Sequence, residues 1–85
     1  MPTYTIPKIE ARLRQILCDE LMVDDEQLTH DAKLIDDLGA EELDVVELVM
    51  VLENRFKIEI DDDQIDKFIT VKDVLQYLMR RLVRS

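Results

Sequence analysis

Apolar residues recur at the spacing of an α-helix in three segments of this sequence, and that pattern constrains the fold more than any other feature. The first segment predicts a helix over residues 6–22, because Thr5 stands at the capping position and Pro7 falls in the first turn. The residues expected to face inward are Ile9, Leu13, Ile16, Leu17 and Leu21.

Two more segments with this period follow in the second half of the chain. Residues 41–57 contain neither glycine nor proline and predict a helix whose core face is Val45, Leu48, Val49, Leu52 and Phe56. One short acidic helical turn is expected within 61–67. Thr70 and Asp73 then match a capping box, which predicts a last helix over about 71–83 with Val71, Val74, Leu75, Leu78 and Leu82 inward.

Residues 23–40 lose the helical period and carry aspartates and the only glycine, which predicts a long loop. Its larger apolar residues are expected to pack against the core: Leu28, Leu34, Ile35 and Leu38. Loops of this length are uncommon in small domains and are usually functional.

The composition agrees with packed helices. A chain of 85 residues has room for one domain, here 1–85, and it buries roughly 60 to 65% of its unfolded surface. Apolar residues make up 47% of it, with one glycine, two prolines and no tryptophan. We therefore predict an all-α fold, a small bundle of three longer helices and one short helix.

Charge is distributed unevenly along the sequence. The net charge is −9, and residues 19–66 contain eighteen acids and three bases, whereas the two ends contain two acids and eight bases. This balance argues against nucleic acid as a partner and favours partners with basic surfaces. An acidic surface that is simply solvated remains the alternative.

Several other site types are disfavoured. The aspartate runs lack the alternating ligands of a calcium loop, so no metal site is predicted. Weak binding of divalent cations that relieves repulsion within the acidic block remains open. His30 is expected to be solvated, and the single cysteine, Cys18, to be half-exposed and unreactive. With neither a signal peptide nor an apolar run long enough to span a membrane, a cytoplasmic location is predicted.

The predicted helix over 41–57 also has an unusual outer face. At 100° per residue, the side opposite the core consists of Leu43, Glu47, Met50 and Asn54. Glu41, Glu42, Asp44 and Glu53 surround it, and Asp44 is expected to point outward like Glu47. Apolar side chains within acidic surroundings predict docking on a basic patch. Glu42 and Glu47 lie on a convex helix in a chain too small for a substrate cleft, so an enzyme is not predicted.

The segment DLGAEELDVVELVM, residues 37–50, followed by LENRF at 52–56, resembles the signature loop and second helix of acyl carrier proteins. The likeness extends from about residue 6 to 82. It implies a small acidic four-helix bundle of fatty-acid or related acyl-chain biosynthesis, in which a serine carries 4′-phosphopantetheine.

Glu42 stands where the family pattern has that serine, and the only serine of the chain is Ser85. The resemblance therefore implies a chain without the phosphopantetheine arm, an arm-less docking or regulatory homologue. The alternative is an ordinary carrier whose serine was replaced by glutamate to keep it unmodified. A structural subunit that uses the same surface without acyl traffic is a third reading.

The resemblance also implies roles for particular residues. The residues that match the partner-docking surface of the family are Leu43, Asp44, Glu47, Met50 and Glu53. The region around an acyl pocket is matched by Val49, Leu52, Ile60, Ile65, Phe68 and Ile69. The implied partners are synthases, dehydratases, reductases and transferases with basic patches, and the chain is expected to be a monomer.

Overall fold

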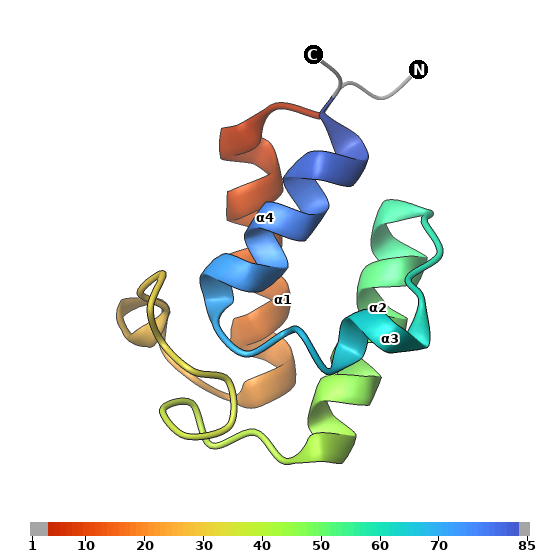
Figure 1. Ribbon diagram of the computed structural model, residues 1–85. Coiled ribbons are helices and arrows are strands. Elements are labelled where there is room, and N and C mark those ends of the chain that lie inside the picture. The colour runs from red at the N-terminus through yellow and green to blue at the C-terminus, as the bar shows by residue number, and fades with distance from the viewer. Residues whose placement is uncertain (1–3, 84–85) are drawn as a thin grey trace.

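The computed structural model describes residues 4–83, and in this part of the chain the fold is an all-α bundle, as predicted. Its three longer helices are α1 (Ile6–Leu21), α2 (Glu42–Phe56) and α4 (Val71–Leu82), and the short helix α3 (Asp62–Ile65) lies between α2 and α4 in the chain. Figure 1 shows α1 and α4 side by side and antiparallel, with α2 on the opposite side of α1 from the long loop. Among residues 4–83, no helix has the length and apolar character needed to cross a membrane.

The predicted helix starts are confirmed. The Thr5 side chain accepts a hydrogen bond from the Lys8 N–H at 3.4 Å. At the start of α4, Thr70 and Asp73 form the predicted capping box, with distances of 2.9 and 3.2 Å. These side chains satisfy amide groups that have no partner within the helix, which is why the helices begin at these residues.

The core consists of the apolar stripes that the sequence predicted. Ile9, Leu13, Leu48, Leu52 and Leu78 are fully buried. The predicted inward faces are confirmed, except that Leu21 and Leu82 are only half-buried at the helix ends. Side chains from α1, α2 and α4 thus form one continuous core.

The loop between α1 and α2 is ordered by backbone hydrogen bonds to the segment before α4, and it contains a single 3₁₀ turn, η1 (Asp25–Gln27). The Leu34 N–H donates to the Ile69 carbonyl at 2.9 Å, and the Val71 N–H donates to the Ala32 carbonyl at 3.0 Å. These bonds attach the loop to the bundle although its sequence has no helical period.

The prediction that all four large apolar residues of this loop pack inward was wrong for one of them. Leu28, Leu34 and Leu38 are buried, but Ile35 is 48% exposed. The Asp37 and Leu38 N–H groups both donate to the Lys33 carbonyl, so the chain makes a helix-like turn here. Residues four apart share a face in such a turn, which directs Leu34 and Leu38 inward and leaves Ile35 on the outside.

Candidate functional site

The segment Asp37–Ala40 fixes the point at which α2 begins. The Asp37 carboxylate accepts a hydrogen bond from the Lys33 N–H at 2.8 Å, while Leu38 and Ala40 are buried on either side of Gly39. Gly39 has φ of +76°, a conformation that costs other residues about 1–2 kcal/mol. The chain's one glycine therefore stands where the backbone turns into the helix.

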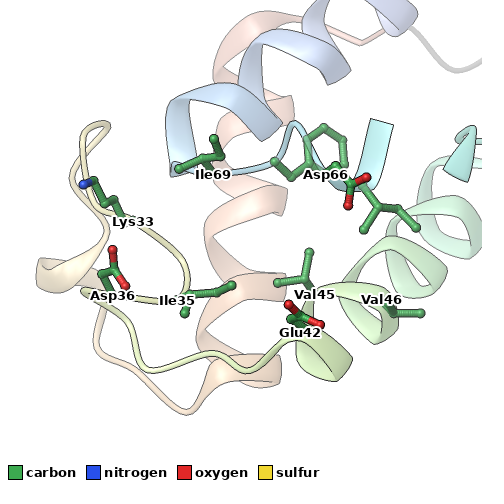
Figure 2. A pocket seen from close by; sticks show the side chains of 10 residues that line it. Lys33, Ile35, Asp36, Glu42, Val45, Val46, Asp66 and Ile69 are labelled. Atoms are coloured by element: carbon green, nitrogen blue, oxygen red, sulfur yellow. The ribbon is translucent and has the colours of Figure 1, made fainter. Parts of the chain in front are cut away.

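Glu42 is the first residue of α2 and is exposed to solvent. Directly before it, the Glu41 N–H donates to the Asp44 carboxylate at 2.8 Å and completes a capping box. In Figure 2 the Glu42 side chain lies beside Val45 at the start of α2, and Ile35 of the loop lines the same pocket. A negative side chain is favourable here because the N-terminal end of a helix carries partial positive charge.

The outer face of α2 has the predicted apolar and acidic character. Leu43 is 66% exposed and Met50 is 61% exposed, and Glu47 and Asn54 are also exposed. Val46, one turn from both apolar residues, is 37% exposed and belongs to the same stripe. We call Leu43, Val46, Glu47 and Met50 the α2 outer face.

The two remaining acids of the predicted docking set, Asp44 and Glu53, accept hydrogen bonds from backbone N–H groups. Asp44 is half-buried, and its carboxylate accepts the exposed hydrogen bond from the Glu41 N–H, so it is less exposed than Glu47 and is used in the helix cap. Glu53 is half-buried and accepts a hydrogen bond from the Ile60 N–H at 2.9 Å. Both carboxylates therefore stabilise the fold of this chain, whatever else they contact.

Beside the α2 outer face lies a pocket of about 410 Å³ (Figure 2). Its apolar wall consists of Ile35, Val45, Val46, Ile65, Phe68 and Ile69, and its charged residues are Lys33, Asp36, Glu42 and Asp66. Three of the residues matched to the acyl-pocket region, Ile65, Phe68 and Ile69, line this pocket. The other three, Val49, Leu52 and Ile60, are buried in the core and do not line it.

Sequence reasoning missed the contribution of the long loop to this pocket. Ile35 and Asp36 were expected to be a core residue and part of the acidic block, yet both lie at the rim opposite α3. The bond between the Leu34 N–H and the Ile69 carbonyl brings these distant segments together. A contact between residues so far apart in the chain leaves no periodic signal in the sequence.

Cys18 and His30 have the exposure that the sequence suggested. Cys18 is half-buried, and its desolvation raises the pKa of the thiol, which disfavours the reactive thiolate. His30 is exposed and contacts the Glu10 carboxylate at 2.9 Å. Within residues 4–83, no group of three or more His, Cys, Asp or Glu side chains is arranged to hold a metal ion.

The helical bundle, the loop that ends in a left-handed glycine and the acidic second helix together define a carrier-type domain. Residues 11–78 match the family model described as "Phosphopantetheine attachment site". An acyl carrier protein from Thermotoga maritima is 43% identical over 75 residues, which cover 88% of this chain and 93% of that protein. The chain belongs to the acyl carrier protein family.

Proposed function

We propose that this chain is an arm-less acyl carrier homologue that docks through the α2 outer face on basic patches of acyl-chain biosynthetic enzymes. The catalysis belongs to those partners, namely synthases, dehydratases, reductases and transferases, and the chain itself is not an enzyme. In this proposal residues 1–85 act as one domain, as a monomer, in the cytoplasm.

The absence of the arm is inferred from the side chain at the start of α2. Glu42 presents a carboxylate there, and α2 contains no hydroxyl side chain. Ser85 lies outside the described residues, and Thr5, Thr29 and Thr70 belong to other parts of the fold. A carboxylate that attacked the donor phosphate would give a labile mixed anhydride in place of a stable ester. The residues present therefore do not fit covalent attachment of phosphopantetheine.

The docking role is supported by the exposure of the α2 outer face. Leu43 and Met50 expose large apolar side chains, and Glu47 lies between them with no hydrogen-bond or ion-pair partner among the described residues. Burying apolar surface provides affinity, while an unpaired charge speeds encounter with an oppositely charged partner. The exposed carboxylate of Glu42 adds to this field, and it is the single observation that most supports a docking role without an arm.

Intact-protein mass spectrometry tests the missing attachment site. The chain with Glu42, incubated with coenzyme A and a broad-specificity phosphopantetheinyl transferase, is expected to gain no mass. Glu42→Ser should gain one arm of about 340 Da, because the new hydroxyl can attack the donor phosphate. Glu47→Ser, which places a serine elsewhere on the exposed side of α2, is the matched control and should not be loaded. Loading of the chain with Glu42 would refute the arm-less assignment.

The same reaction measures docking once Glu42→Ser has supplied a hydroxyl. In that background Glu47→Lys should slow loading by about tenfold at low salt and flatten its salt dependence, because a repulsive charge opposes encounter with a basic partner. Glu20→Lys makes the same charge change at an exposed position of α1 and should change the rate by less than about twofold. Equal effects of the two lysines would show that only net charge matters.

The alternative, an ordinary carrier whose natural serine was replaced, is favoured by the completeness of the surrounding motif from Asp37 to Asp44. The sequence of the source gene distinguishes the two, since it encodes either serine or glutamate at position 42. A purely structural subunit would instead co-purify with one stable partner that has no role in acyl chemistry.

A further inference from the structure

A second concave surface, which shares no residue with the α2 outer face, lies between the α3 segment and α4. It has a volume of about 470 Å³ and is lined by Gln64, Lys67, Asp73, Gln76, Tyr77, Arg80 and Arg81. We call it the α3–α4 groove. Three of its seven side chains are cationic and one is a carboxylate, in a chain whose net charge is −9.

Arg81 is held in one orientation by its neighbours. Its Nη1 atom donates to the Glu59 carbonyl at 2.7 Å and to the Tyr77 hydroxyl, and its Cζ atom lies 5.6 Å from the centre of the Tyr77 ring. Tyr77 is fixed in turn by an edge-to-face contact with the buried Phe68, at 5.4 Å between ring centres. The Nε and Nη2 groups of Arg81 have no partner among the described residues, so a preorganised guanidinium has donors to spare.

The cations of the groove are not neutralised within the described part of the protein. The ion pairs between residues 4 and 83 all involve Arg14 or His30, and none includes Lys67, Arg80 or Arg81. The one carboxylate, Asp73, accepts hydrogen bonds from the Thr70 and Ile69 N–H groups at 2.9 and 3.2 Å. Asp73 therefore caps the start of α4, and the three cations leave the groove with a net positive charge.

We propose that the α3–α4 groove binds the phosphate monoester group of a small molecule. A phosphate monoester is close to a dianion at neutral pH, with a second pKa of about 6, and its oxygens match the fork of an arginine. Gln64 and Gln76 can hydrogen-bond a polar organic body attached to it. Asp63 and Asp66 neighbour Gln64 and Lys67 in the chain but do not line the groove. Salt weakens their opposing charge with distance, over about 8 Å at physiological ionic strength, so the cations that line the groove act most strongly on a bound anion.

Amide NMR spectra of the ¹⁵N-labelled full chain test this site. Inorganic phosphate and glycerol 3-phosphate are titrated separately at constant ionic strength, with sodium chloride as the reference salt. We expect saturable shifts at Lys67, Gln76 and Arg80, and tighter binding of glycerol 3-phosphate, whose hydroxyls reach the glutamines. Shifts that do not saturate, or that chloride reproduces, would overturn the proposal.

Substitutions distinguish specific binding in the groove from nonspecific attraction of an anion to positive charge. Lys67→Gln and Arg80→Gln should each weaken binding by about tenfold, since each removes a charged donor. Arg81→Lys keeps the charge and loses the fork, and should also weaken binding by about tenfold. Arg12→Gln removes one cation from an exposed position of α1 and should change affinity by less than about twofold.

Two results would contradict the proposal at this stage. One is a loss of affinity in Arg12→Gln equal to that in Lys67→Gln and Arg80→Gln. The side chains of Lys67 and Arg80 make no hydrogen bond or ion pair within residues 4–83, so their removal should not disturb the fold. The other is tighter binding of a hexaglutamate peptide than of glycerol 3-phosphate, which would assign the groove to an acidic protein segment. Melting curves of all variants accompany the titrations, and if Arg81→Lys unfolds, the other two variants decide.

Discussion

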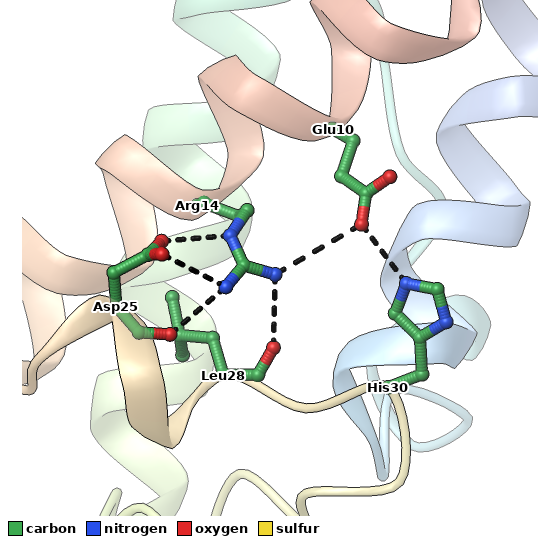
Figure 3. Close-up of polar contacts among 5 residues, drawn as sticks. All are labelled: Glu10, Arg14, Asp25, Leu28 and His30. Atoms are coloured by element: carbon green, nitrogen blue, oxygen red, sulfur yellow. Dashed lines mark hydrogen bonds and ion pairs between the residues drawn. The ribbon is translucent and has the colours of Figure 1, made fainter.

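Arg14 connects α1 to the loop that precedes the candidate site (Figure 3). Its guanidinium donates to both carboxylate oxygens of Asp25 at 2.7 and 3.0 Å, to the Asp25 carbonyl at 2.9 Å and to the Leu28 carbonyl at 3.0 Å. Glu10 approaches the same guanidinium at 3.9 Å and also contacts His30. The hydrogen bonds from Arg14 lower the pKa of the Asp25 carboxyl below its usual value of 3.8.

We therefore predict that Arg14→Gln destabilises the protein in a pH-dependent way. A carboxyl group whose pKa is lowered by folding adds stability above its unfolded pKa, and that stability is lost as pH falls through the folded pKa. The difference in melting temperature between the two chains should be largest near pH 7 and should shrink below pH 3.8. A remainder of about 1–2 kcal/mol should persist in acid, because the bond to the Leu28 carbonyl does not titrate.

Arg12→Gln is the matched control for this prediction. It removes the same charge from an exposed position of α1 and should leave the melting temperature nearly unchanged at either pH. A pH-independent difference between the natural chain and Arg14→Gln would mean that Asp25 contributes nothing to stability.

At the scale of the element, α2 carries acids with two different tasks. Asp44 completes the capping box at the start of the helix, and Glu53, near the end of the helix, accepts a hydrogen bond from the Ile60 N–H. Glu47 is exposed and makes no bond that would fix it within the bundle. In the proposed docking role, folding and docking therefore depend on different carboxylates of one helix.

This division predicts opposite outcomes for two alanine substitutions. Asp44→Ala should cost about 1 kcal/mol through loss of the cap, or about 4–8 °C in melting temperature for a domain of this size. Glu47→Ala should not lower the melting temperature but should slow docking, as measured by loading in the Glu42→Ser background. Circular dichroism melts of both variants provide the comparison, and equal melting temperatures would show that the cap contributes no stability.

Across the whole molecule, negative charge is concentrated without matching cations. Residues 19–66 contain eighteen acids and three bases, and around the pocket Asp36, Glu42 and Asp66 face only Lys33. Such a concentration of like charge destabilises the compact state. Raising ionic strength from about 0.01 to 0.5 M, or adding millimolar magnesium, should therefore raise the melting temperature by screening this repulsion.

The double variant Asp36→Asn, Asp66→Asn tests the source of that effect. It removes two pocket carboxylates that make no hydrogen bond or ion pair among the described residues. The variant should melt at a higher temperature in low salt and show a smaller increase with salt. Melting that is independent of salt in the natural chain would contradict the repulsion argument.

The helices were predictable because their determinants are local. Hydrophobic period, the capping residues Thr5 and Thr70 and the absence of breakers between 41 and 57 placed all three longer helices within two residues of their observed ends. The exposure of Leu43 and Met50 follows from the same period. Residues near one another in sequence decide these features, so the features can be predicted from the sequence alone.

The pocket and the α3–α4 groove depend on contacts between distant segments, and only the tertiary structure decided them. Ile35 reaches the pocket because the Leu34 N–H bonds the Ile69 carbonyl, and Arg81 is fixed because the Glu59 carbonyl lies beside α4. Likewise, the backbone bond to Glu53 forms only once the chain after α2 turns back on it. The sequence alone determined which residue types were available at each helix face. The tertiary hydrogen bonds selected which of them meet, because bonds between distant segments follow no period along the chain.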